Sequence, residues 1–169
     1  KKINFDGKEF VCENNVQKEK VFFILKDKIK ALNFEGQSSL MKHLTNNEIR
    51  ENHQNLFLNE DHVKEMKKDD LITFGCHTHN HLCFSNFNKE IIESEIIESK
   101  KILREKLNIE TFHFAYPYGS SNDINYFEHD ILKKLKFRSA VTTSEINNKD
   151  NSNFYLSRMS IGPFVSMED

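Results

Sequence analysis

Three histidines lie within five residues, in the segment His77-Thr78-His79-Asn80-His81. Imidazole is a common ligand of zinc and of neighbouring divalent metals. In a helical turn, residues i and i+4 point the same way, so His77 and His81 could bind one ion while His79 points elsewhere. A catalytic zinc needs a third protein ligand and an open position for water. The segment predicts a metal site, and a polar loop with incidental histidines is the alternative.

A second segment with chemical potential is Tyr116-Pro117-Tyr118-Gly119, which breaks a predicted strand into a loop. The rings of Tyr116 and Tyr118 could stack on a sugar, or they could pack around the proline turn. The sequence leaves both interpretations open. Cys76 and Cys83 flank the histidines, and burial is the usual environment of such cysteines, although they could also ligate a metal.

The elements that would position these segments fall into two regions. Residues 1–58 are polar, rich in Lys and Asn and mostly helical in pattern. A hairpin is predicted for residues 3–11, where Asp6-Gly7 suits a tight turn, and helices are predicted for residues 16–32 and 38–51.

From residue 59 onward, helices and strands alternate. Asn59 and Asn88 are predicted helix N-caps. The predicted helices cover residues 59–68, 88–107 and 125–136, and the predicted strands cover 71–75, 112–115, 137–142 and 155–161. This order predicts an α/β fold with parallel strands. Functional sites in such folds lie at the carboxyl ends of strands, which selects residues 76–81 and 116–120.

Composition narrows the class of protein. The 169 residues are 37% hydrophobic and 30% charged, with 15 Phe, which is typical of a globular domain. The net charge of -2 gives no indication of a nucleic-acid partner. No apolar run has membrane-spanning length. No signal peptide is visible. Because the first residue is Lys1, we expect a trimmed product or fragment, and the sequence leaves both a cell-envelope and a cytoplasmic location open.

Four segments resemble the polysaccharide deacetylase (NodB-like) family of carbohydrate esterases. Residues 74–81 are similar to its His-Ser/Thr-x-x-His metal motif, and residues 114–119 to its Arg-x-Pro-Tyr-Gly motif. Residues 88–106 resemble the helix that links these motifs, and residues 155–161 resemble the closing strand of its longer members. The resemblance covers residues 59–161 well and residues 1–58 weakly.

The resemblance implies a partial or distorted (β/α) barrel with a helical N-terminal insertion, and zinc or a similar divalent metal. It implies that His77 and His81 ligate the metal and that the hydroxyl of Thr78 supports their loop. The backbone N–H of Tyr118 would donate to an oxyanion. The residues around it, Tyr116, Pro117 and Gly119, would contact the substrate.

The sequence departs from the family pattern in places that matter for catalysis. The family's first motif has two adjacent aspartates, one the general base and one the third metal ligand, and it has no clear match here. Asp69-Asp70 precedes a predicted strand, where a turn explains it, and Asp6 stands alone in a turn pair. Ala115 occupies the position of the third-motif arginine.

A late Leu-x-His motif, which supplies the family's general acid, is also without a match. Arg158 cannot replace it, since guanidinium keeps its proton. His113 is predicted to be a buried strand residue instead.

The sequence therefore predicts a metal-dependent hydrolase that removes N-acetyl groups from an amino-sugar polymer or glycan. A metal- or glycan-binding pseudoenzyme is the first alternative, and a structural α/β domain with an incidental histidine cluster is the second. Residues 59–169 would form the C-terminal part of the deacetylase domain, and residues 1–58 would form a lid or insertion.

Overall fold

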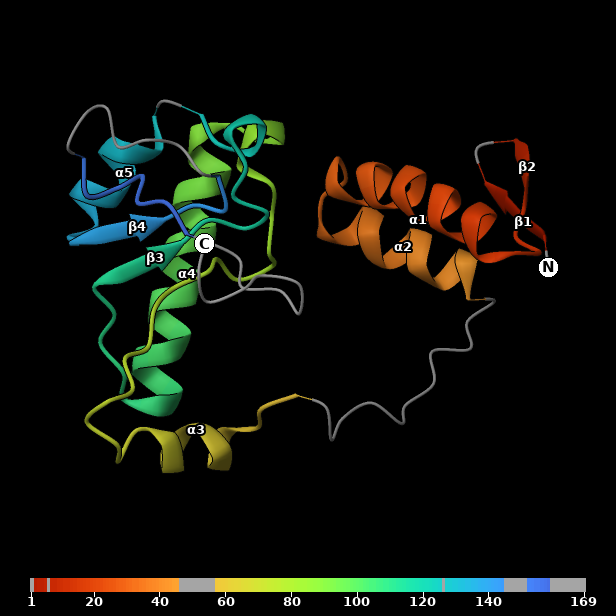
Figure 1. Ribbon diagram of the computed structural model, residues 1–169. Helices are drawn as coiled ribbons and strands as arrows, with labels where there is room; N and C mark the ends of the chain where they lie inside the picture. Colours follow the sequence, from red (N-terminus) through yellow and green to blue (C-terminus); the bar gives the residue numbers. More distant parts are fainter. Residues whose placement is uncertain (1, 6, 46–56, 126, 145–151, 159–169) are drawn as a thin grey trace, which may run out of the picture. The chain divides into compact units, whose positions relative to one another are not determined.

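The chain divides into two compact units, residues 1–58 and 59–169, whose elements are drawn in Figure 1. The computed structural model describes residues 2–5, 7–45, 57–125, 127–144 and 152–158. The smaller unit holds a hairpin and two helices, and the larger unit alternates helices with short parallel strands.

The smaller unit begins with the predicted hairpin. Strands β1 (Lys2–Phe5) and β2 (Lys8–Val11) pair antiparallel, with Phe5 opposite Lys8. The close pairing of these two residues leaves a two-residue connection, as expected for the tight turn that the sequence predicts. The hairpin prediction is confirmed, while Asp6 itself lies outside the described residues.

Helix α1 (Asn15–Lys30) begins at an asparagine cap. The Asn14 side chain accepts a hydrogen bond from the backbone N–H of Gln17 at 2.9 Å, which satisfies one of the open donors at the helix start. Helix α2 (Phe34–Leu44) uses Asn33 in the same way. It therefore begins earlier than the predicted residue 38, because the sequence interpretation overlooked this cap.

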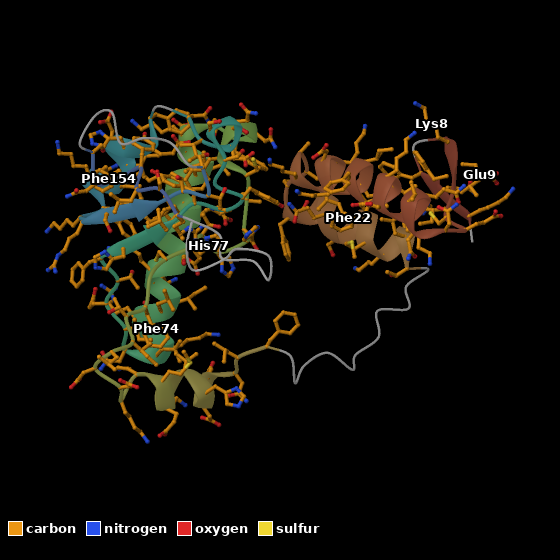
Figure 2. The ribbon with its side chains drawn as sticks, viewed as in Figure 1. Lys8, Glu9, Phe22, Phe74, His77 and Phe154 are labelled. Atoms are coloured by element: carbon orange, nitrogen blue, oxygen red, sulfur yellow. The ribbon has the colours of Figure 1, made fainter. Side chains whose placement is uncertain are left out.

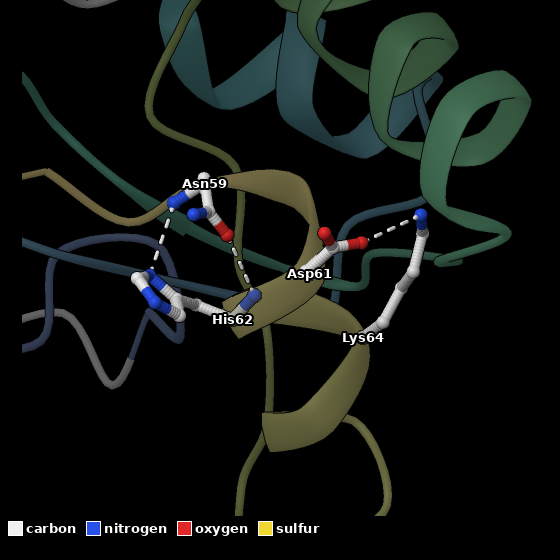
Figure 3. Close-up of polar contacts among 4 residues, drawn as sticks. All are labelled: Asn59, Asp61, His62 and Lys64. Carbon is white, nitrogen blue, oxygen red and sulfur yellow. Dashed lines mark hydrogen bonds and ion pairs between the residues drawn. The ribbon is translucent and has the colours of Figure 1, made fainter. Parts of the chain in front are cut away.

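In the larger unit, helix α3 (Glu60–Met66) confirms the predicted cap at Asn59. The Asn59 side chain accepts from the backbone N–H of His62 at 2.9 Å, and the His62 ring accepts from the Asn59 N–H at 3.3 Å. Figure 3 shows this reciprocal pair together with the exposed Asp61–Lys64 ion pair at 3.2 Å. The cap therefore fixes the start of α3, at the first residue of the larger unit.

Helix α4 (Lys89–Leu107) matches the predicted bounds and is capped by Asn88, whose side chain accepts from the backbone N–H of Ile91. It ends where Asn108 adopts a left-handed conformation with φ 51°, a usual way to terminate a helix. Ile92 and Ile96 on its inner face are fully buried. No helix in the described part of the chain is both long and apolar enough to cross a bilayer.

The sheet of the larger unit is parallel, as predicted. Strand β3 (His113–Ala115) pairs with β4 (Ser139–Val141), and single parallel bridges join Cys76 to Phe114 and Val141 to Leu156. The fold is therefore mixed α/β. Within the described residues neither two-stranded sheet closes on itself, so the partial or distorted barrel stays a prediction.

The predicted buried strand at residues 71–75 is wrong. Leu71 is 93% exposed, and Asp69 accepts hydrogen bonds from the N–H of Leu71 through its carboxylate and from the N–H of Ile72 through its carbonyl. These bonds fold the segment into a turn, so its donors do not join the sheet. Pairing begins only at Cys76, and Gly75 permits the close approach because a Cβ there would lie 3.0 Å from the His113 carbonyl oxygen.

Three short helices complete the larger unit. They are η2 (Phe84–Asn86), η3 (Ser121–Asp123) and α5 (Glu128–Lys134). The sequence predicted helix over residues 125–136, and α5 forms the central part of that range. Of the predicted last strand, the described residues contain only the bridge at Leu156.

One hydrophobic core joins these elements. The helices and the sheet contribute its buried side chains, which are Cys76, Phe84, Ile92, Ile96, Phe114, Tyr116, Ile131, Leu132, Phe137, Ala140 and Phe154. Phe114 lies among aromatic neighbours, with ring centroids 5.8 Å from Phe84 and 5.3 Å from Tyr116. Such a close-packed core holds β3 rigidly and with it the loop that follows Ala115.

A carboxyl group is buried in this core. Glu128 is fully buried, and its Oε1 accepts the backbone N–H of Asn125 at 2.7 Å, whereas its Oε2 has no hydrogen-bond partner within the described part of the chain. Burial raises the pKa of Glu128 from 4.5 to about 7, because the apolar surroundings disfavour the charged form.

This raised pKa predicts a stability that falls as pH rises. Between pH 4.5 and about 7 the folded chain keeps a proton on Glu128 that the unfolded chain has lost, so the stabilisation present at low pH is lost toward neutrality. Glu128→Gln should remove this dependence. From pH 5 to pH 8, urea unfolding should show wild type losing about 2 kcal/mol relative to the variant. Parallel pH profiles would contradict the assignment.

Candidate active site

Two loops meet at the carboxyl end of β3. The N–H of Cys76 donates to the His113 carbonyl at 2.8 Å, and the Ala115 N–H donates to the Cys76 carbonyl at 2.9 Å. Because these segments run parallel and in register, the loops that follow them leave the sheet side by side. Figure 2 shows His77 in the first of these loops. Residues 77–81 and 116–120 are thereby brought together.

His77 is fixed by a backbone carbonyl. Its Nδ1 lies 2.7 Å from the Ala115 oxygen. A carbonyl can only accept, so Nδ1 carries the hydrogen and the neutral ring presents the lone pair of Nε2. Metal-binding histidines commonly have this arrangement, because the second hydrogen bond fixes both tautomer and ring orientation.

His81 faces His77, with ring centroids 4.7 Å apart. The sequence predicted this convergence from the i, i+4 geometry of a helical turn, but the segment is not helical. Thr78 and His81 instead adopt left-handed conformations, with φ 63° and 55°. The two rings are therefore close for a different reason from the one predicted, namely two reversals of the backbone.

Electrostatics favour the neutral imidazole at His81. Partial burial lowers the pKa of His81, and the nearby His77 lowers it further because two positive rings would repel. Metal binding requires an unprotonated ring nitrogen. The direction of the shift at His81 therefore favours its binding to a divalent cation.

The second loop brings Tyr118 against the histidines. The Tyr118 ring centroid lies 4.8 Å from that of His81. Tyr118 and Gly119 both have positive φ, at 61° and 74°. Thr143 holds the loop, since its hydroxyl donates to the Tyr118 carbonyl at 2.7 Å and its N–H donates to the Gly119 carbonyl at 2.9 Å. The oxyanion role of the Tyr118 N–H stays a prediction.

Tyr116 and Pro117 belong to the core rather than to an open surface. Tyr116 is 1% exposed, its hydroxyl donates to the Phe154 carbonyl at 3.0 Å, and its ring stacks on Tyr155. Pro117 and Gly119 are also buried. Of the two interpretations that the sequence left open for Tyr116, packing is the one found. Substrate contact by Tyr116, Pro117 and Gly119 stays a prediction, and their burial does not support it.

Sequence reasoning missed Asp123, a buried carboxylate behind this loop. Its Oδ2 accepts from the N–H of Ser120 at 3.0 Å and from the Ser120 hydroxyl at 2.5 Å, and the Cys83 thiol donates to its Oδ1 at 3.6 Å. The spacing Ser-x-x-Asp after the glycine was the available signal, because it matches a reciprocal cap.

Several other residues that the sequence analysis weighed for a functional role have structural contacts instead. His113 is exposed rather than buried, and its Nδ1 lies 2.8 Å from the Ser139 hydroxyl. The prediction failed because alternate residues of β3 face opposite sides, and Phe114 takes the inner one. Arg158 donates through Nε to the Thr142 carbonyl at 2.9 Å. Cys76 is buried, with its sulfur 3.3 Å from the Thr111 hydroxyl oxygen.

The donor set fits two positions of a metal site. Among the described residues no group of three or more His, Cys, Asp or Glu side chains is arranged to hold an ion, so the third ligand is not found there. The buried hydroxyl of Thr78 has no hydrogen-bond partner in the same ranges of the chain. The sequence expected that hydroxyl to support the loop, and no such bond is found among these residues.

Comparisons with known proteins identify a family and two similar solved structures. A family model described as polysaccharide deacetylase matches residues 10–140. The solved deacetylase PplD of Streptococcus pyogenes, in complex with acetate, is 32% identical with a TM-score of 0.58, covering 66% of this chain and 48% of that chain. No curated protein matches the chain.

A second solved structure, IcaB from Ammonifex degensii, shows the fold alone. It is 20% identical with a TM-score of 0.50, covering 63% of this chain and 49% of that one. The chain thus spans about half the length of each of these structures.

The tight turn at Gly119 predicts an unusual sensitivity to a methyl group. In Gly119→Ala the new Cβ would lie 3.0 Å from the Thr143 nitrogen and 3.1 Å from the Tyr116 oxygen, at a φ of 74°. Backbone strain and steric clash together should cost about 2 kcal/mol or more. Urea unfolding measures this loss in the free energy of unfolding, and residue-resolved amide exchange measures it for individual residues.

Gly7→Ala is the matched control, because Gly7 has a similar φ of 69° but no described atom within 4 Å of the added Cβ. It should lose only about 1 kcal/mol, from strain alone. Equal losses in the two variants would show that the loop around Gly119 is not packed as described.

Proposed function

The chain belongs to the polysaccharide deacetylase family, and from this premise we propose that it forms part of a metal-dependent hydrolase that removes N-acetyl groups from an amino-sugar polymer or glycan. The substrate class is a carbohydrate that carries an acetylated amine. The proposal concerns the function of the whole protein, since the chain spans about half the length of its solved structural neighbours.

The observation that carries the proposal is the histidine pair beside the Tyr118 loop. The rings of His77 and His81 are 4.7 Å apart, and the His77 Nδ1 lies 2.7 Å from the carbonyl oxygen of Ala115. The two imidazoles are thus in contact, and the backbone fixes the orientation of one of them. Metal-binding histidines commonly have such a second hydrogen bond, which supports a role of this pair as metal ligands.

These residues suit zinc or a similar divalent ion. His77 through Nε2, together with His81, would supply two of its ligands. When bound, the ion would supply Lewis-acid polarisation of the acetyl carbonyl and a lower pKa for water. The chain's own contribution is to hold the two rings close together, with the orientation of His77 fixed, before any ion arrives, which lowers the reorganisation that binding requires.

The second loop is suited to the negative charge that develops on the acetyl oxygen. A backbone N–H at Tyr118 would donate to that oxygen, and the loop is held from behind by Thr143. A donor fixed by the fold needs no reorientation during the reaction, and this is why such donors stabilise tetrahedral intermediates effectively. Tyr118 also forms one wall beside His81.

The sequence supports a second candidate function, a metal- or glycan-binding domain without catalysis. Ala115 replaces the family's motif arginine, and neither Asp6 nor Asp69-Asp70 is a clear match to the aspartate pair. A hydrolase needs a base to take the proton of the attacking water. If the complete protein lacks the aspartate pair, the histidine site would bind metal or glycan without catalysing hydrolysis.

The finer architectural expectations belong to the same proposal. The parallel strands of the larger unit would form part of a distorted barrel, and residues 1–58 would be an insertion or lid. The family match begins at residue 10 and includes most of residues 1–58, which supports only that this region is part of the deacetylase domain.

The experiment is acetate release from N-acetylglucosamine oligomers in the presence of zinc. It should be made with the native full-length protein and with the 169-residue chain. We expect release by the full-length protein and at least a roughly hundredfold loss in its His81→Ala variant, because one metal ligand is removed. His79→Ala, which alters an exposed neighbour, should retain activity.

The outcomes separate the two candidates. If the full-length protein binds zinc and oligosaccharide but releases no acetate, the pseudoenzyme replaces the deacetylase. If neither zinc nor oligosaccharide binds, both candidates are wrong and the histidine cluster is incidental.

A further inference from the structure

A carboxylate on α4 holds the loop between the two histidines. Glu95 accepts two hydrogen bonds from Asn80, one from the backbone N–H at 2.7 Å and one from the side-chain amide at 2.7 Å. Each bond uses a different oxygen of the carboxylate, Oε2 for the backbone and Oε1 for the side chain. Charge-assisted, two-point contacts of this kind fix orientation as well as distance.

The loop has a particular need for such an anchor. Thr78 and His81 both adopt the left-handed region, which costs free energy for residues with a Cβ. The Thr78 hydroxyl is buried without a partner among the described residues, so no compensating bond from it is found. Strained conformations persist only where surrounding contacts over-determine them.

The anchor itself is rigid. Glu95 precedes Ile96, which is fully buried in the core, and Ile92 on the previous turn is buried as well. The helix around Glu95 therefore cannot shift without disturbing the core. The carboxylate offers the loop a fixed point, just as the Ala115 carbonyl does at the His77 end.

We propose that Glu95 is a positioning residue which, through Asn80, sets His81 opposite His77 and thereby determines the affinity of the pair for a divalent metal. The loop is held at both ends: β3 fixes His77, and α4 fixes the residue before His81. This inference rests on the proposed function, because it assigns Glu95 to the same metal site without contact to the ion.

The hydrogen-bond chemistry provides a rescue test. In Glu95→Gln one acceptor becomes an amide donor that faces the Asn80 amide, so one bond is lost. In Asn80→Asp two carboxylates face each other. The combined variant restores both bonds, since the introduced glutamine amide can donate to the introduced aspartate carboxylate while the glutamine oxygen accepts the backbone N–H. Glu98→Gln is the control, because Glu98 lies on the same helix and forms a partly exposed ion pair with Lys101 at 3.7 Å.

Isothermal titration with zinc alone measures the affinity of each variant, and thermal unfolding reports whether each is folded. We expect the Glu95→Gln and Asn80→Asp single variants to bind zinc about tenfold more weakly or worse, as is usual when a supporting partner is lost. The combined variant should recover most of that loss, and Glu98→Gln should bind like wild type. A general effect on stability would not produce recovery on adding a second substitution.

The failure of this inference is distinguishable from that of the proposed function. Wild-type zinc affinity in both folded single variants would overturn the role of Glu95 and leave the metal site intact. Weakening without recovery in the combined variant would also overturn it. A wild-type chain that binds no zinc would overturn the metal site and, with it, the role of Glu95.

Discussion

The hydrogen bond from His77 Nδ1 to the carbonyl oxygen of Ala115, 2.7 Å long, is the interaction on which the candidate site depends. It joins the loop after Cys76 to the end of β3, and it determines which nitrogen of His77 faces outward. Ala115 stands where the family's third motif has arginine, yet the backbone carbonyl serves whatever side chain is present. The side chain at this position can thus change while the backbone carbonyl continues to orient His77.

The fold could be predicted well where local chemistry determines it. Asn59 and Asn88 cap their helices as expected, and β3 and β4 are parallel as the alternation of helix and strand indicated. The prediction failed at residues 71–75, where a run of apolar residues suggested a strand. Asp69 captures the backbone N–H groups of Leu71 and Ile72 there, and a residue that competes for backbone donors leaves little trace in hydrophobic periodicity.

The proximity of His77 and His81 was predicted from the sequence, but the backbone geometry that produces it was not. His77 and His81 do lie together, but left-handed backbone at Thr78 and His81 achieves this rather than a helical turn. Tyr116 is an aromatic residue of the kind that stacks on sugars, but it is buried, and its hydroxyl donates to the Phe154 carbonyl. This contact could not be predicted from the sequence, because it depends on the three-dimensional packing of the core. Contacts between segments far apart in sequence, such as that of Glu95 with Asn80, leave no recognisable pattern in a single sequence.

The most direct test of the account is long-range proton–nitrogen NMR of the histidine rings, recorded without metal and then with zinc. The account predicts that neutral His77 carries its hydrogen on Nδ1 before zinc is added. Zinc should then shift the ring nitrogens of His77 and His81, while those of His113 and His129 stay unchanged. A His77 ring protonated on Nε2, or zinc-induced shifts that do not single out this pair, would contradict the account.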